Sequence, residues 1–340
     1  MSIRTGAHYD RKMRPAFTPA KLASGDEVRV VAPSRSLAMI SAANREIANS
    51  RFESTGLAVS FGDHVEDHNQ FGSSSIEHRV TDLHAAFVDP NVKAILTAIG
   101  GDNANQLLPY LDWDLIGANP KIFCGYSDIT ALSCGIYAKT GLITYSGPHY
   151  SRFGMRDHFE QTQRWFDAAL RSDTPVVVEP SATWTDDPWF LNQDTRDIRR
   201  NEGYWIMTEG NATGQLMGGN LCTLNLLHGT GFMPDLRETI VFIEDDSESN
   251  LVTFDRDLTS LTQQPGFDQV RGLLIGRFQT QVKMTQETLR EILSTKRELN
   301  GMPIIANLDF GHTDPILTIP VGGTATIEAD CGVAHITLSD

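Results

Sequence analysis

TAIGGDNANQLLPYLDWDLIGANPKIFCGYSDIT, residues 97–130, decides the fold, because two short apolar runs in and beside it each stop at glycine. The runs cover residues 94–99 and 121–124, and such runs predict buried strands of a parallel sheet. Helical patterns follow them at residues 103–111 and 128–139. Ser127 is therefore predicted on a tight turn between strand and helix, at the carboxyl edge of the sheet, where open α/β sheets bind their ligands.

The turn around Ser127 has the composition of a nucleophile site. The serine hydroxyl would meet the positive end of the following helix, and the backbone N–H of Asp128 could stabilise a developing oxyanion. Gly101 in the neighbouring turn is expected to supply a second N–H, and Gly100 lets the backbone approach a substrate closely. The α/β-hydrolase pattern Gly-x-Ser-x-Gly is disfavoured because residue 129 is isoleucine. At this point a serine that only caps the helix is an equal alternative.

Composition predicts a cytoplasmic globular protein of two domains. The chain has 340 residues, and its formal net charge of −15 argues against a nucleic acid polymer or an anionic membrane as main partner. No apolar run has the length of a membrane span, and the first 21 residues lack the hydrophobic core of a signal peptide. Four scattered cysteines without metal-ligand spacing predict reduced, mostly buried thiols: Cys124, Cys134, Cys222 and Cys331.

The periodicity of the chain changes near residue 180. Strands and helices alternate over residues 1–179, which predicts an N-terminal α/β domain with a parallel sheet. Strand patterns dominate residues 180–340, which predicts a β-rich C-terminal domain. Between the two, residues 182–202 are rich in Trp, Asp and Arg without a clean period. We interpret them as a long loop, which in a compact domain is usually functional.

A serine nucleophile needs a base and an orienting carboxylate. His312 is the candidate base because it sits at a glycine-marked turn just after the expected strand 303–307. Glu244 is the candidate acid because it is the first acidic residue at the end of the apolar strand 239–243.

Two other motifs receive structural interpretations. His64 and His68 are four residues apart but not on an evident helix, so we expect no metal there. The glycine-dense tract 210–219 has neither Walker nor dinucleotide spacing and is interpreted as a tight turn.

Five motifs in order resemble the LD-carboxypeptidase family of serine peptidases over residues 19–336. They are GGDNANQLLPYLDW after Ile99, GYSDIT at 125–130, GQLMGGNL at 214–221, FIED at 242–245 and FGHT at 310–313.

This resemblance implies a Ser-Glu-His triad at Ser127, Glu244 and His312, and an oxyanion hole at the backbone of Gly101 and Asp128. It also implies a homodimer without metal or cofactor, whose active site lies between the α/β domain and the β-rich domain.

The family has two substrate branches. One removes terminal D-alanine from muropeptide tetrapeptides. The other, of the microcin C self-immunity type, cleaves the bond between an aspartyl carboxyl group and a nucleotide-like moiety. The tryptophans and arginines of the long loop favour the second branch, because an aromatic ring suits stacking on a base and arginine suits an anionic linker. The substrate-binding residues expected on this basis are Gly100, Trp184, Trp189, Arg196, Arg199 and Asn220.

Two alternatives from other classes stay open. A catalytically silent protein could use the same cleft to bind a nucleotide or peptide. A glutaminase-like enzyme would need a cysteine nucleophile, but Cys124 lies inside the expected strand and not on the turn.

Overall fold

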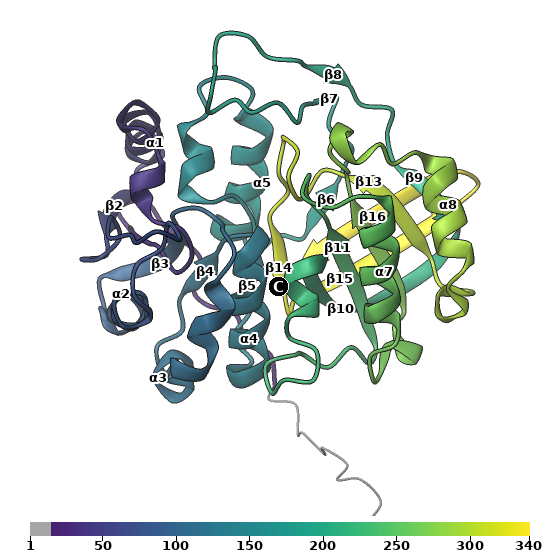
Figure 1. Cartoon of the computed structure of the whole chain (residues 1–340), viewed down its shortest axis with the longest axis horizontal. Coiled ribbons are helices and arrows are strands. Elements are labelled where there is room, and N and C mark those ends of the chain that lie inside the picture. Colours follow the sequence, from purple (N-terminus) through teal and green to yellow (C-terminus); the bar gives the residue numbers. More distant parts are fainter. Residues whose placement is uncertain (1–14) are drawn as a thin grey trace, which may run out of the picture.

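Two large sheets form the body of the protein, as the computed structural model shows for residues 15–340 (Figure 1). The first 14 residues of the expected N-terminal domain lie outside the described residues. The six strands of the first sheet are, in spatial order, β14 (Ile319–Val321), β5 (Thr144–Ser146), β4 (Ile122–Cys124), β3 (Val92–Thr97), β1 (Glu27–Val31) and β2 (Ala58–Phe61). All neighbours are parallel except β14, which pairs antiparallel with β5. The predicted α/β fold with a parallel sheet is confirmed.

Helices cover both faces of this sheet because its strands are apolar on both sides. Ile95 and Phe123 belong to one buried cluster together with residues of α2, α3 and α4. Leu96 and Ile122, one position along each strand, belong to a second cluster with residues of α1 and α5. The helices are α1 (Ala42–Ser54), α2 (Ile76–Val88), α3 (Trp113–Ala118), α4 (Thr130–Thr140) and α5 (Glu160–Arg171).

The second sheet is mixed and has eight strands. In spatial order they are β6 (Val176–Val178), β16 (Val333–Ser339), β15 (Thr324–Asp330), β10 (Gly210–Asn220), β11 (Thr239–Glu244), β12 (Gly272–Gly276), β13 (Ile304–Leu308) and β9 (Trp205–Thr208). The centre, from β10 to β13, is parallel, and the flanking strands are antiparallel. Its helices are α6 (Leu221–Asn225), α7 (Leu251–Thr262) and α8 (Gln286–Ser294).

The glycine-dense tract 210–219 was predicted to be a tight turn, and this prediction is wrong. The tract forms most of strand β10. Gly218 and Gly219 have φ values of 146° and 141°, a region that residues with a side chain rarely adopt. A Cβ atom on Gly218 would lie 1.7 Å from the carbonyl oxygen of Phe242 in β11. Gly218 therefore allows the close approach of β11, while Gly219 leaves room for Thr130 of α4, whose Oγ1 would lie 2.4 Å from a Cβ atom there. The turn-like composition of the tract does not reveal either role.

Other differences from expectation are local. The helix predicted at residues 103–111 is a 3₁₀ helix, η2 (Ala104–Tyr110), and contains Pro109. The loop at 182–202 includes a two-stranded antiparallel pair, β7 (Thr183–Trp184) and β8 (Arg199–Arg200). The chain ends in a hairpin of β15 and β16, in which Cys331 and Gly332 turn with positive φ.

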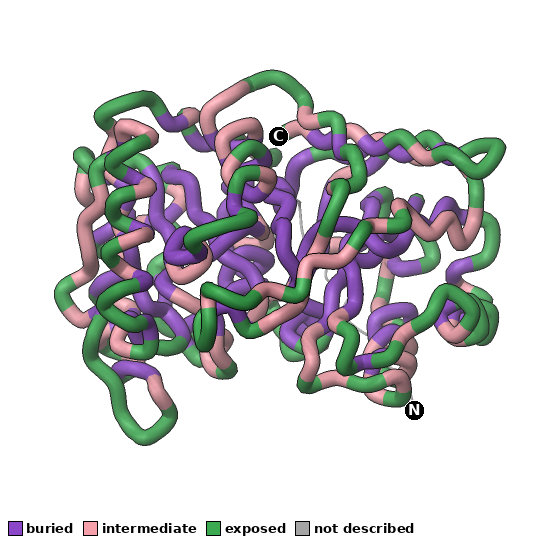
Figure 2. The backbone as a smooth tube through the Cα atoms, turned by 90° about the horizontal axis from the view of Figure 1, so that it is seen from above, coloured by how far each residue is buried: buried purple, intermediate pink, exposed green. Residues whose placement is uncertain are grey.

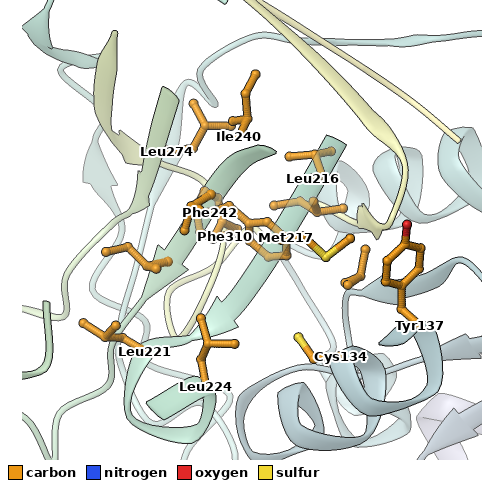
Figure 3. Close-up of a cluster of buried hydrophobic side chains, with 14 of the residues drawn as sticks. Cys134, Tyr137, Leu216, Met217, Leu221, Leu224, Ile240, Phe242, Leu274 and Phe310 are labelled. Carbon is orange, nitrogen blue, oxygen red and sulfur yellow. The ribbon is translucent and has the colours of Figure 1, made fainter. Parts of the chain in front are cut away.

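One buried cluster joins the two halves of the chain. Figure 3 shows Cys134 and Tyr137 of α4 beside Leu216 and Met217 of β10, and all four belong to the same core. Buried segments run through the interior of both halves (Figure 2). The boundary near residue 180 stays a prediction, but two strands cross it, because β6 joins the second sheet and β14 joins the first. No helix within residues 15–340 is long and apolar enough to span a membrane.

Candidate active site

Ser127 lies on the predicted turn between β4 and α4. It opens a short 3₁₀ segment, η3 (Ser127–Ile129), that leads directly into the helix. Its φ is 60°, in the left-handed region, which costs a non-glycine residue about 1–3 kcal/mol and recurs at active sites. The hydroxyl of a serine that only caps a helix accepts a bond from the helix backbone, but η3 and α4 have no such side-chain cap. The geometry therefore favours a presented hydroxyl over a capping one.

Ser127, His312 and Glu244 form a hydrogen-bonded chain. His312 Nε2 lies 3.1 Å from Ser127 Oγ, and His312 Nδ1 lies 2.7 Å from Glu244 Oε2. Because an ionised carboxylate only accepts, Nδ1–H donates to Glu244 and the serine hydroxyl donates to Nε2. The three residues come from the ends of β4 and β11 and from the loop after β13, so both sheets contribute to this arrangement.

Two glycines leave room for the Glu244 side chain. A Cβ atom on Gly311 would lie 2.6 Å from Glu244 Oε2, and one on Gly276 would lie 2.9 Å from Glu244 Cβ. Glu244 is only 3% exposed. Burial alone would lower the pKa of His312, but the Glu244 carboxylate outweighs it and raises the pKa above the ordinary value. The carboxylate therefore makes His312 a stronger base towards Ser127.

Asp128 anchors the glycine turn beside the nucleophile. Its Oδ2 accepts hydrogen bonds from Ser34 Oγ and from the backbone N–H groups of Asn103 and Ala104. Burial raises the pKa of this carboxyl despite the three donors. A Cβ atom on Gly100 would lie 3.3 Å from Ser127 Oγ, so the turn lies directly against the serine.

Gly101 adopts a φ of 155°, and a Cβ atom there would lie 2.4 Å from Ser34 Oγ. The Gly101 N–H forms no hydrogen bond within residues 15–340. The oxyanion roles expected for Gly101 and Asp128 remain a prediction.

A polar group that was not predicted from the sequence, centred on His149, lies near Ser127 and Gly100. The His149 ring stacks on Tyr126 at 4.3 Å between centroids. The Tyr126 hydroxyl accepts from Arg152 Nε at 2.8 Å, and Arg152 pairs with Asp314 at 3.0 Å. His149 follows β5, the neighbour of β4, so the rule that ligand sites lie at the carboxyl edge could have found it.

The tryptophans expected to bind substrate have different surroundings. Trp184 is partly exposed, and the guanidinium groups of Arg199 and Arg277 lie 5.2 and 5.1 Å from its ring centroid. Trp189 is 3% exposed and belongs to the core of the first sheet. In this structure only Trp184 of the two has ring surface near the molecular surface.

The remaining expected binding residues are held by protein partners. Arg196 donates to Asp187 at 2.8 Å, and its side chain is 6% exposed. Asn220 is 2% exposed and caps α6 by accepting from Thr223. It is also the register partner of Glu244 in neighbouring parallel strands. A substrate role for these residues is untested and stays a prediction.

One cluster within residues 15–340 has the composition of a metal site: His64, Asp67 and His78. Of the two histidines considered in the sequence, it includes His64 but not His68. His64 Nδ1 and His78 Nδ1 lie 3.1 and 3.0 Å from the same oxygen, Asp67 Oδ2. His68 instead faces the carbonyl oxygen of Glu66 at 3.2 Å. The two imidazoles already share Asp67 as a hydrogen-bond acceptor, which explains the cluster without an ion.

A two-sheet fold with a hydrogen-bonded Ser-His-Glu chain is the kind of arrangement that serine hydrolases use. Comparison with known proteins gives the family. Residues 28–147 match the LD-carboxypeptidase N-terminal domain, and residues 213–327 match the LD-carboxypeptidase C-terminal domain. The chain belongs to the LD-carboxypeptidase family.

Relatives with similarity along nearly the whole chain agree with this assignment. The predicted carboxypeptidase YocD of Bacillus subtilis is 50% identical, over 93% of this chain and 98% of its own. The crystal structure of an MccF-like protein from Bacillus anthracis has a TM-score of 0.94 and 52% identity, covering 95% of this chain and 99% of its own.

The microcin C7 self-immunity protein MccF of Escherichia coli is 32% identical, over 92% of this chain and 93% of its own. Its structure in complex with aspartyl sulfamoyl adenosine has a TM-score of 0.83 and covers 95% of this chain and 98% of its own.

Proposed function

We propose that this protein is a serine hydrolase that cleaves the bond between an aspartyl carboxyl group and a nucleotide-like moiety. The observation that carries the proposal is the hydrogen-bonded chain from Ser127 through His312 to Glu244. A nucleophile, a base and an orienting carboxylate in this order are the parts that acyl transfer needs.

In the proposed mechanism His312 accepts the proton of Ser127 as the serine oxygen attacks the acyl carbon. Glu244 holds the imidazole in the correct tautomer and stabilises its charged form. The N–H groups of Gly101 and Asp128 are proposed to stabilise the oxyanion. His312 then gives its proton to the leaving group, and water hydrolyses the acyl-enzyme.

The substrate assignment has two supports. MccF, a relative along nearly the whole chain, binds aspartyl sulfamoyl adenosine. Trp184 and Arg199 offer an aromatic ring and a cation on neighbouring strands β7 and β8, which suit a base and an anionic linker.

Substrate turnover tests both parts of this proposal. We expect the wild type to hydrolyse aspartyl sulfamoyl adenosine faster than a muropeptide tetrapeptide, while Ser127→Ala, which keeps the fold, hydrolyses neither. His312→Ala should reduce the rate of hydrolysis by several orders of magnitude. The double variant with Ser127→Ala should be little slower than either single variant, because triad members act as a unit.

Other results would point to the alternatives. Preference for the tetrapeptide would assign the protein to muropeptide trimming with the same triad. Turnover of neither, with tight binding of one, would indicate a catalytically silent binding protein. The homodimer and the cytoplasmic location also stay predictions, and light scattering of the purified protein tests the first.

A further inference from the structure

His149, beside the nucleophile, has one ring nitrogen without a partner. The residue is 2% exposed, and its Nε2 forms no hydrogen bond among residues 15–340. A Cβ atom on Gly100 would lie 3.3 Å from this nitrogen and also 3.3 Å from Ser127 Oγ. Nε2 and the nucleophile therefore border the same small space, which glycine leaves open. A buried polar atom without a partner is rare, and at this place it indicates a contact that the substrate completes.

The other ring nitrogen fixes the tautomer of His149. Nδ1 lies 2.7 Å from Thr97 Oγ1, which itself lies 3.3 Å from the carbonyl oxygen of Cys124. When the Thr97 hydroxyl donates to this carbonyl, Nδ1–H can donate to Oγ1, and both hydrogen bonds form. With the proton on Nε2 instead, Nδ1 would have to accept from the Thr97 hydroxyl, and the hydrogen bond from this hydroxyl to the Cys124 carbonyl would be lost. Burial, Arg152 and His312 lower the pKa of His149 well below its ordinary value, so the ring is neutral and Nε2 carries a lone pair.

The surroundings fix the direction of this lone pair. The Tyr126 ring stacks on the imidazole at an interplanar angle of 28°. Tyr126 is itself held through its hydroxyl by Arg152, which pairs with Asp314. An acceptor held in this way needs no reorganisation when a donor arrives, and this raises its selectivity for a donor over an apolar group.

We propose that His149 Nε2 accepts a hydrogen bond from the α-nitrogen of the aminoacyl part of the substrate. The α-nitrogen is two bonds from the carbon that Ser127 attacks, so a substrate placed for attack brings its N–H towards the space beside Gly100. His149 then selects acyl groups that carry an α-N–H, which is an amino group in an aspartyl nucleotide and an amide in a muropeptide. The inference rests on the proposed function, because it assumes attack by Ser127.

Ligand binding to Ser127→Ala protein tests this contact without turnover. The probes are aspartyl sulfamoyl adenosine and its desamino analogue, succinyl sulfamoyl adenosine, with Kd measured by calorimetry. We expect the amino ligand to bind roughly tenfold tighter or more, the effect of a hydrogen bond that involves a charged group. Adding His149→Phe keeps a ring on Tyr126 but removes the lone pair, so the two Kd values should converge. His149→Gln offers an amide oxygen near the same position and should restore part of the preference.

An unchanged preference in the folded His149→Phe variant would overturn the inference. Should that variant fail to fold, Thr97→Val takes its place, because it removes the oxygen that fixes Nδ1–H and lets the proton move to Nε2. The preference should then shrink, and an unchanged value there overturns the inference equally. Failure of the proposed function looks different: the wild type would not cleave the aspartyl ligand, although the Ser127→Ala protein still distinguished the two probes.

Discussion

The Asp128 carboxylate accepts a hydrogen bond of 2.5 Å from the Ser34 hydroxyl, although 94 residues separate them in the chain. The same oxygen accepts from the N–H groups of Asn103 and Ala104 at 2.9 and 2.8 Å. One buried atom thus joins the loop after β1, the turn after β3 and the turn that carries Ser127. The position of the nucleophile relative to the glycine turn depends on this atom.

Asp128→Ala should therefore lower both stability and activity. It leaves buried donors without an acceptor, at about 1–3 kcal/mol each, so we expect urea unfolding to show a loss of roughly 3 kcal/mol or more. The matched control is Asp102→Ala, which removes an exposed carboxylate paired with the Arg35 side chain and should cost less than about 1 kcal/mol. Equal losses in the two variants would contradict the role given to Asp128.

The raised pKa of His312 predicts opposite pH trends for activity and stability. Activity needs the neutral imidazole, so the acid limb of kcat/KM should have its midpoint above the ordinary value of about 6.5. A raised folded pKa contributes stability that is fully present below the unfolded pKa and is lost as pH rises through the folded pKa.

Over this window activity should rise while the stability contributed by His312 falls. The difference in unfolding free energy between wild type and His312→Gln, followed from pH 5 to 9, isolates this contribution. Glu244→Gln removes the carboxylate that raises the pKa and should move the acid limb of residual activity to lower pH. An acid limb at the same pH in Glu244→Gln would argue against the Glu244 contact as the cause of the raised His312 pKa.

Trp184 and Trp189 should respond differently to alanine. Loss of a stacking face on a base costs roughly 1–3 kcal/mol, so Trp184→Ala should reduce kcat/KM about tenfold or more for an aspartyl nucleotide analogue and much less for a plain peptide. Trp189 is 3% exposed in the core, so Trp189→Ala should cost about 3–5 kcal/mol of stability and affect both substrates alike. Equal losses on both substrates for Trp184→Ala would show that this ring is also structural.

Metal chelation should leave hydrolysis unchanged. The mechanism proposed for Ser127 and His312 uses no ion, and the cluster of His64, Asp67 and His78 is satisfied by its own hydrogen bonds. We expect the same kcat/KM before and after dialysis against EDTA, and in a His78→Ala variant. Inhibition by EDTA that zinc reverses in the wild type but not in His78→Ala would instead make this cluster functional.

Local sequence signals were sufficient to select Ser127, Glu244 and His312 as candidates. Each stands at the end of an apolar strand or beside a glycine turn, and the structure brings the three within hydrogen-bond distance of one another. Their catalytic roles stay a prediction. Long-range features were not predictable in this way. Pairing of β14 with β5 leaves no local pattern, because three apolar residues fit either sheet.

The need for glycine at position 218 is equally non-local, because it comes from the close approach of Phe242 in the neighbouring strand β11. The position of His149 after β5 could be predicted from the sequence, but the lack of a hydrogen-bond partner at its Nε2 is apparent only in the structure.

The crossing of β14 into the first sheet bears on recombination between relatives. A chimaera that joins residues before 180 of one homologue to the remainder of another would bring a foreign edge strand against β5. It would also separate β6 from β16, its own partner in the eight-stranded sheet. His312 lies seven residues before β14, so a poor fit of that strand would shift the base relative to Ser127 even where each half folds. Such a hybrid should stay active when β6 and β14 are each exchanged together with the sheet to which they belong. A cut near residue 180 does not meet this condition.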